Sequence, residues 1–133
     1  MPSRFDHEKL NVYQRSLQFV VWVTELLERI PAKVAAHGQI ERAATSIPLN
    51  IAERNGRFTP ADRCRFFDTA RGSALECAAA LDVLVAKRVL AEKEEVETGK
   101  SQLIEIVNML VGLIRANSET RLHEDDIPYK VAQ

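Results

Sequence analysis

The sequence lacks the residues that build disulfide-linked, zinc-binding or membrane-spanning proteins. Its 133 residues include two cysteines, Cys64 and Cys77, which are too few and too far apart for a disulfide framework or a zinc site. No uncharged stretch approaches the roughly 18 residues that a membrane helix needs, and residues 1–10 carry charges where a signal peptide would be apolar. We therefore expect a cytoplasmic protein that makes no membrane contact.

Glycine, proline and aromatic residues are scarce as well. There are five glycines and five prolines, and aromatic residues make up 6% of the chain. These glycines and prolines stand where helices would begin, end or bend, and not at the short regular spacing of a sheet protein. The 46% of hydrophobic residues and 28% of charged residues are typical of an ordinary globular domain. A single all-α domain follows.

Apolar residues recur with helical spacing in four segments. The predicted helices cover residues 8–30, 39–54, 59 to 88 or 90, and 93–117. Thr59 and Pro60 form a strong start signal, because threonine caps a helix and proline fits its first position. We expect an antiparallel up-and-down four-helix bundle over residues 5–117 and a polar, flexible C-terminal tail over residues 118–133.

The first and fourth predicted helices are apolar around most of their circumference. Leu17 and Val20 belong to one stripe of the first helix, and Phe19 and Val23 belong to a second stripe roughly 120° away. A helix in a monomeric bundle buries one stripe, so the surplus predicts a subunit interface and a homo-oligomer. The alternative is that these residues are scattered exposed aliphatics, which are common on protein surfaces.

Proline interrupts the second predicted helix. Pro48 removes one backbone donor and pushes against the carbonyl of Ala44, which costs about 3 kcal/mol unless the helix bends. Ser46 and Asn50 can compensate, so we expect a bend at Pro48 and a buried or half-buried hydrogen bond from Asn50. The alternative is that a polar cluster of Arg42, Asn50 and Glu53 binds a ligand.

No set of residues in the sequence has the spacing of a catalytic site. His7, His37 and His123 lie near predicted helix or chain ends without the spacing of metal ligands. Cys77 has no histidine near it in sequence and lies on an apolar helix face, which is typical of a small buried side chain. We expect no enzyme activity, no metal and no cofactor.

A basic segment stands out within this weakly acidic chain. Between Arg42 and Arg71 there are six arginines and three acidic residues, a regional charge of +3 in a chain of net charge −1. Arginine suits phosphate contacts, and an exposed phenylalanine can stack on an unpaired base. The residues that we expect to bind RNA or DNA are Arg54, Arg57, Phe58, Arg65 and Arg71. Two alternatives remain: the arginines are solvated or salt-bridged, or the protein is a scaffold for a protein partner without nucleic-acid binding.

The middle of the chain carries a motif. It reads Arg-Ala-Ala at 42–44, Ser-Ile-Pro at 46–48, Asn-Ile-Ala-Glu at 50–53 and Gly-Arg at 56–57, followed by Phe-Phe at 66–67 and Gly-Ser at 72–73. Over residues 5–115 the chain resembles the four-helix-bundle family of 23S rRNA intervening-sequence proteins. Arg54 and Glu41 depart from this pattern, because they stand where the family has glycine and a basic residue. The motif residues for which we expect structural roles are Arg42, Ser46, Pro48, Asn50, Glu53, Gly56 and Ser73.

This resemblance implies a small up-and-down bundle that assembles into a ring of five. Members of the family are encoded inside insertions in bacterial ribosomal RNA genes. A related group, the accessory protein of diversity-generating retroelements, is a partner of nucleic acid and reverse transcriptase. The resemblance therefore implies a homopentamer that is not an enzyme.

Overall fold

The computed structural model of the protein describes residues 4–54, 59–91 and 93–117, and over these residues it contains only helices. A short 3-10 helix, η1 (Asp6–Lys9), precedes α1 (Asn11–Leu27), α2 (Ala35–Glu53), α3 (Pro60–Ala86) and α4 (Lys93–Ala116). The prediction of an all-α chain with four long helices is therefore confirmed. The tail predicted over 118–133 lies outside the described residues.

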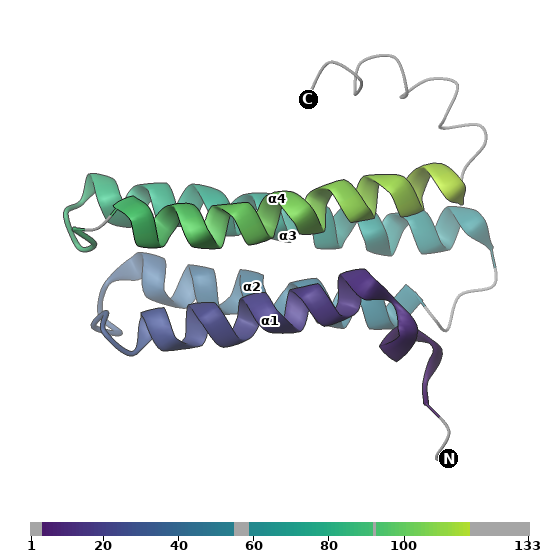
Figure 1. Cartoon of the computed structure of the whole chain (residues 1–133), viewed down its shortest axis with the longest axis horizontal. Helices are drawn as coiled ribbons and strands as arrows, with labels where there is room; N and C mark the ends of the chain where they lie inside the picture. Colours follow the sequence, from purple (N-terminus) through teal and green to yellow (C-terminus); the bar gives the residue numbers. More distant parts are fainter. Residues whose placement is uncertain (1–3, 55–58, 92, 118–133) are drawn as a thin grey trace.

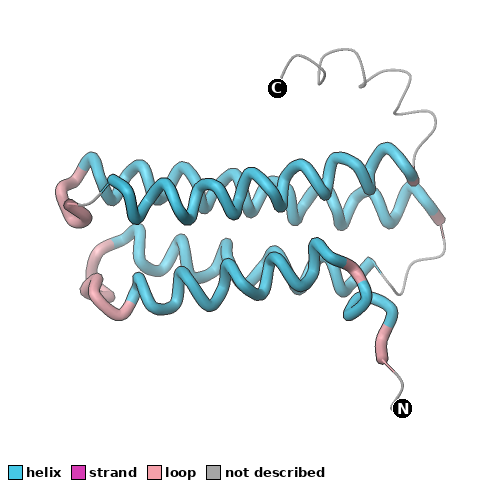
Figure 2. The backbone as a smooth tube through the Cα atoms, viewed as in Figure 1, coloured by secondary structure: helices cyan, strands magenta, loops and turns pink. Residues whose placement is uncertain are grey.

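The four helices run side by side, and the chain reverses direction between one helix and the next (Figure 1). One hairpin consists of α1 and α2, and the other consists of α3 and α4 (Figure 2). Contacts join α2 to α3 and α1 to α4 as well, so each helix packs against two neighbours. The start of α1, the end of α2, the start of α3 and the end of α4 lie at one end of the molecule.

The core lies along the line where the four helices meet, and each helix contributes one stripe at i, i+3 and i+4 spacing. The largest fully buried side chains on these stripes are Phe19, Val23, Leu26, Ile40, Ile47, Ile51, Cys64, Phe67, Leu81, Leu84, Ile106 and Leu110. The stripe of α3 is formed largely by small residues, and Ala70, Ala74 and Cys77 are fully buried. Small side chains let the neighbouring helices approach closely. None of the described helices is both long enough and apolar enough to cross a bilayer.

The start of α3 is as predicted. The Thr59 side chain accepts a hydrogen bond from the backbone N–H of Asp62 at 3.1 Å, and Pro60 occupies the first turn. At the other end the helix stops at Ala86, earlier than predicted. Arg88 has a left-handed backbone with φ of 61°, and Val89 N–H donates to the Leu84 carbonyl at 2.9 Å. This is the pattern of a helix-terminating motif that usually has glycine at the left-handed position.

Two other helix boundaries differ from prediction. The helix predicted over 8–30 is divided, because Leu10 has an extended backbone between η1 and α1. The helix predicted to begin at residue 39 begins at Ala35, so Gly38 lies inside its first turns. Burial explains this early start, since Ala36 is 2% exposed and extends the apolar stripe of α2 by one turn.

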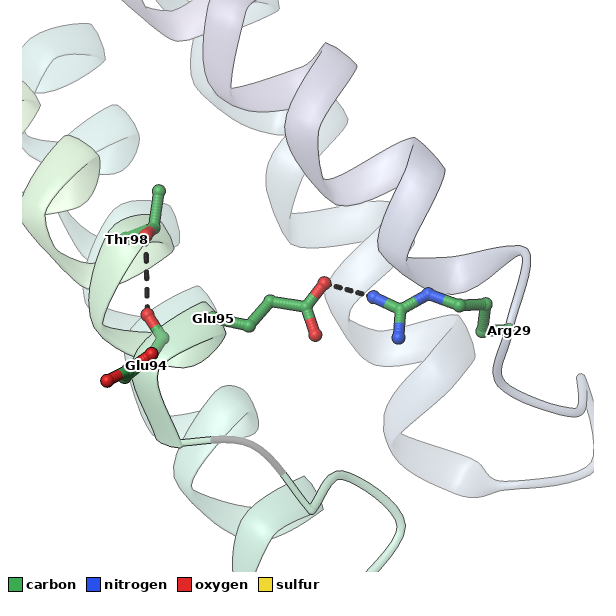
Figure 3. Close-up of polar contacts among 4 residues, drawn as sticks. All are labelled: Arg29, Glu94, Glu95 and Thr98. Atoms are coloured by element: carbon green, nitrogen blue, oxygen red, sulfur yellow. Dashed lines mark hydrogen bonds and ion pairs between the residues drawn. The ribbon is translucent and has the colours of Figure 1, made fainter.

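Ion pairs on the surface link α4 to its neighbours. Arg15 of α1 pairs with Glu105 of α4, and Arg29, in the turn after α1, pairs with Glu95 of α4. Figure 3 shows the second pair beside the first turn of α4, where Thr98 donates to the Glu94 carbonyl at 3.3 Å. Exposed pairs of this kind contribute little to stability, typically about 0–1 kcal/mol, but their geometry fits only one register of α4 against α1.

Gly99 allows α1 and α4 to approach closely. It is buried on α4, and a Cβ at this position would lie 2.9 Å from Cζ2 of Trp22 and closer still to two other carbons of the same ring. Trp22 also stacks on Phe19 at 5.7 Å between ring centroids. The Trp22 indole therefore occupies the space that any other residue at position 99 would need.

We predict that Gly99→Ala lowers the free energy of unfolding by about 1–2 kcal/mol. Alanine favours the helix by about 1 kcal/mol over glycine, but forcing its methyl group against a packed ring costs about 1–3 kcal/mol or more. Trp22 is the protein's one tryptophan, so its emission should shift to the red as the ring is displaced. Urea denaturation followed by this emission measures both effects.

Gly112→Ala is the matched control. Gly112 lies on the same helix, and no atom outside its own turn of helix stands within 4 Å of the position that an added methyl group would take. This substitution should raise the free energy of unfolding by about 0.5–1 kcal/mol. If Gly99→Ala raised the free energy of unfolding as much as Gly112→Ala, the packing of the Trp22 ring would not require glycine at position 99.

Candidate nucleic-acid interface

Arginines from two helices meet at the end of the bundle where α2 stops and α3 starts. Arg54 follows the last residue of α2, and Arg63 and Arg65 lie in the first turns of α3. Asn117, after the end of α4, contacts Arg63. We call Arg54, Arg63 and Arg65 the basic end; it lies at the right of Figure 1.

Arg54 is half-buried, and its guanidinium lies over an aromatic ring. Its Cζ is 5.8 Å from the centroid of Phe67, within the range of a cation–π contact. Its Nε is buried and has no hydrogen-bond partner among the described residues. Burial, and then the nearby Arg63, lower the pKa of Arg54, whereas Asp6 acts in the opposite direction. A buried cationic donor without an acceptor is unfavourable, so an incoming anion at this position would be favoured.

Arg63 is held by the end of α4. Its Nε donates to Oδ1 of Asn117 at 3.0 Å, and Nδ2 of Asn117 donates to the Leu113 carbonyl at 2.8 Å. Arg63 is half-buried. It was not among the residues that we expected to bind nucleic acid, although the fold places it near Arg54.

Arg65 and Arg71, which we expected to bind RNA or DNA, both lie beside an aspartate. Each lies 3.8 Å from an aspartate one turn earlier on α3: Asp62 for Arg65 and Asp68 for Arg71. The Arg65 side chain is 76% exposed and remains open to solvent, whereas that of Arg71 is 24% exposed. Arg65 therefore belongs to the basic end, and Arg71 lies about 9 Å further along α3. The predicted residues Gly56, Arg57 and Phe58 lie outside the described residues.

A ring stack that the sequence prediction missed also lies at this end. Phe5 stacks on His7 at 5.7 Å between centroids with an interplanar angle of 14°, and His7 meets the edge of Tyr13 at 4.7 Å. Tyr13 packs against the hydrophobic core. Phe5 lies outside the helical periodicity. The sequence pointed to Phe5 and Tyr13 only as part of the opening that resembles the family's start, and not as a ring stack.

The motif residues in the middle of α2 form a hydrogen-bond chain. Asn50 Nδ2 donates to the Ser46 carbonyl at 2.9 Å and to Ser46 Oγ at 2.8 Å, and Ser73 Oγ of α3 lies 2.9 Å from Ser46 Oγ. The expected half-buried hydrogen bond of Asn50 is thus present, and the helix continues through Pro48. Both acceptors of the Asn50 amide are on Ser46. The Ala44 carbonyl, which Pro48 leaves without a backbone donor, is not one of them. Arg42 and Glu53 lie on the exposed side of α2.

Large aliphatic side chains are exposed on two opposite faces. Leu17 and Val21 of α1 and Leu49 of α2 form what we call the α1/α2 patch; Leu49 is 63% exposed and Val21 is 60% exposed. A hollow of about 280 Å³ also lies between these two helices and is lined by Val20 and Thr45 among others. The surplus predicted on α1 is therefore present, but the contribution of α2 was not foreseen.

The second patch consists of Leu75 of α3 and Ile104 of α4, 55% and 61% exposed, and we call it the α3/α4 patch. Asp82 of α3 pairs with Lys100 of α4 at 2.5 Å, which marks the seam between these helices. Leu75 lies two turns from Asp82, and Ile104 lies one turn from Lys100. Both residues therefore lie on the same seam. The two hairpins pack against each other in Figure 1, so their outer seams face away from each other.

Cys77 has no nucleophilic character in this fold. Both cysteines are buried thiols. Burial, with a smaller contribution from Glu76, raises the pKa of the Cys77 thiol to about 12. The thiol therefore stays protonated near neutral pH. Among the described residues no group of three or more His, Cys, Asp and Glu side chains is arranged to hold a metal ion.

Comparisons with known proteins identify a family and a structural neighbour from a related family. The family model described as "23S rRNA-intervening sequence protein" matches residues 8–112. A crystal structure of a protein of unknown function from the S23 ribosomal protein family of Bacteroides thetaiotaomicron superposes with a TM-score of 0.72 at 26% sequence identity, covering 77% of this chain and 97% of that one. No curated protein matches the sequence.

We predict that Asn50→Ala lowers the free energy of unfolding by about 1–3 kcal/mol, because it removes the donor that both Ser46 oxygens use in a half-buried position. Thr45→Ala is the control, since Thr45 is exposed on the same helix and also bonds a carbonyl one turn back, that of Glu41. It should cost about 0.5 kcal/mol or less. Thermal melts that coincide for wild type and Asn50→Ala would show that the Asn50 amide is merely solvated, and would reopen a ligand-binding role for it.

Proposed function

Because this chain belongs to the family of 23S rRNA-intervening sequence proteins, we propose that it is a non-enzymatic, antiparallel up-and-down four-helix bundle that assembles into a ring and binds RNA or DNA through its basic end. One observation carries the nucleic-acid proposal. The half-buried Arg54, beside Arg63, has an Nε without a hydrogen-bond partner among the described residues. A phosphate oxygen is the natural acceptor for such a donor.

The basic end has the composition of a weak phosphate site. Arg65 is open to solvent, and its aspartate neighbour at 3.8 Å is too distant for a close bidentate pair. The same end carries Asp6 and Glu8 on η1, which limit the affinity of one copy. Several copies on one ring would act together and strengthen the binding.

The ring proposal rests on the two apolar patches. They differ in composition and lie on opposite faces, so one copy's α1/α2 patch can meet the next copy's α3/α4 patch. Such head-to-tail contacts close into a ring when the rotation between copies allows it. Because both patches lie on the sides of the bundle, this contact would place every basic end on the same rim. The family resemblance supplies the number five.

We predict a homo-oligomer near five times the chain mass of 15.0 kDa in native mass spectrometry. Val21→Lys and Ile104→Lys should each abolish the ring, because each buries a charge in one half of the contact. A mixture of the two variants should form a heterodimer. The Val21→Lys chain keeps its α3/α4 patch, and the Ile104→Lys chain keeps its α1/α2 patch. Val83→Lys is the control: Val83 is 42% exposed and lies outside both patches, so the ring should survive. A wild type that is only a monomer at micromolar concentration would contradict the ring.

We also predict salt-sensitive binding of RNA or DNA, measured by fluorescence anisotropy between 50 and 200 mM salt. The logarithm of affinity should fall linearly with the logarithm of salt concentration. Arg54→Gln combined with Arg65→Ala should flatten the slope by about 0.7–0.9 for each phosphate that the variant no longer neutralises. Lys87→Ala, just past the end of α3 at the opposite end of the bundle, should leave the slope unchanged.

The alternative function is a scaffold whose exposed faces bind a protein partner. Absence of binding below about 100 μM at 50 mM salt, for both single-stranded RNA and duplex DNA, would remove the nucleic-acid proposal and favour this alternative. A salt slope that is identical for wild type and the double arginine variant would move the contact away from the basic end.

A further inference from the structure

Phe5 presents a flat aromatic face to solvent from a fixed position. Its side chain is 68% exposed, the largest exposure among the large hydrophobic residues described. The ring is nevertheless supported, because it stacks on His7, which in turn contacts Tyr13 at the edge of the core. Gln14 of α1 donates to the Glu8 carbonyl at 3.2 Å and fastens η1 to α1. A supported ring loses little conformational freedom when a ligand stacks on it.

This ring lies at the same end of the bundle as the unpartnered Arg54 Nε. η1 contacts both α1 and α2, and Asp6, the residue after Phe5, is close enough to Arg54 to affect its pKa. An exposed aromatic ring and a half-buried guanidinium therefore lie at the same end of the molecule, on elements that contact each other. That is the combination on which proteins bind unpaired nucleotides: the base stacks on the ring and the phosphate meets the arginine.

We propose that the basic end binds single-stranded nucleic acid in preference to duplex, with an unpaired base stacked on Phe5 and an adjacent phosphate at Arg54. This inference rests on the nucleic-acid function proposed above and adds the form of the ligand and the residue that selects it. In a duplex the faces of the bases are covered by their neighbours, so Phe5 would have no face to contact.

The charges around Phe5 also favour single-stranded nucleic acid over duplex. Asp6 and Glu8 flank the ring on η1, and their carboxylates oppose the dense row of phosphates on a duplex. A single strand is more flexible and has a lower charge density. It can place one phosphate at Arg54 and direct its neighbours away from the carboxylates. Apolar stacking then supplies affinity that phosphate contacts alone would not.

The test compares a fluorescein-labelled single-stranded RNA with a duplex of the same sequence by anisotropy at 50 mM salt, using the full chain. Wild type should bind the single strand more tightly than the duplex. Phe5→Ala should weaken single-strand binding by about 5- to 150-fold, which corresponds to the range for one base stacked on an aromatic side chain. It should leave duplex binding and the salt slope unchanged. Phe5→Trp should restore the affinity, whereas Phe5→Leu should not.

A base analogue gives a direct readout of stacking. A single 2-aminopurine in the RNA should lose emission on binding to wild type and lose less on binding to Phe5→Ala at saturating protein. Val83→Ala, which shortens another exposed apolar side chain, should behave as wild type in both assays. Because Phe5 is exposed, its variants should melt with the wild type, and a matching melt shows that weaker binding does not come from unfolding.

The outcomes separate the two proposals. Salt-dependent binding that Phe5→Ala leaves intact, or weakens equally for single strand and duplex, overturns the stacking inference and leaves the phosphate contact at the basic end in place. Absence of wild-type binding to both RNA forms overturns the stacking inference, and absence of binding to duplex DNA as well overturns both proposals.

Discussion

The close packing of α3 against both α2 and α4 is the constraint on which the rest of the structure depends. The fully buried alanines and Cys77 along α3 let its two neighbours approach closely. The same approach brings Ser73 within hydrogen-bond distance of Ser46 and places the first turn of α3 against the end of α4, where Arg63 meets Asn117. A larger residue on this stripe would separate the helices and disconnect the hydrogen bonds together with the core.

Close packing also assigns different roles to the sides and the end of the bundle. Along the sides the helices bury one another's apolar stripes, and the exposed aliphatic residues can be covered only by another molecule. At the end the helices stop, and charged and aromatic side chains from distant parts of the chain meet. The ring and the nucleic-acid site that we propose therefore use different surfaces, and a substitution in one need not disturb the other.

Arg54 departs from the rules that the core obeys. A half-buried guanidinium over Phe67, beside another arginine and with an unpartnered Nε, destabilises the isolated chain. Gln102 Oε1 and Arg115 Nε of α4 are also buried without a hydrogen-bond partner among the described residues. In the core, by contrast, the buried Ser16 donates to the Tyr13 carbonyl at 2.7 Å. Departures of this kind concentrate at functional sites, where a ligand supplies the missing interaction.

The sequence by itself determined the features that depend on neighbours within one or two helical turns. These are the four helices and their buried stripes, the Thr59 cap and the presence of a half-buried hydrogen bond from Asn50. Local spacing sets which residues share a face, and so it predicted that α1 has apolar surface to spare. Helix boundaries were less predictable, because burial of Ala36 and the left-handed backbone of Arg88 decided them.

Only the tertiary structure decided which faces meet. Gly99 and Trp22 are far apart in the chain, and so are Arg63 and Asn117. Periodicity within a helix carries no information about which other helix it will face. For the same reason the sequence grouped Arg71 with Arg54 and Arg65 by proximity along the chain, whereas the fold places Arg63 with Arg54 and leaves Arg71 further along α3. Leu49 and Leu75 likewise belong to opposite faces only because the two hairpins pack against each other, so the surfaces proposed for function come from helix packing that no local pattern encodes.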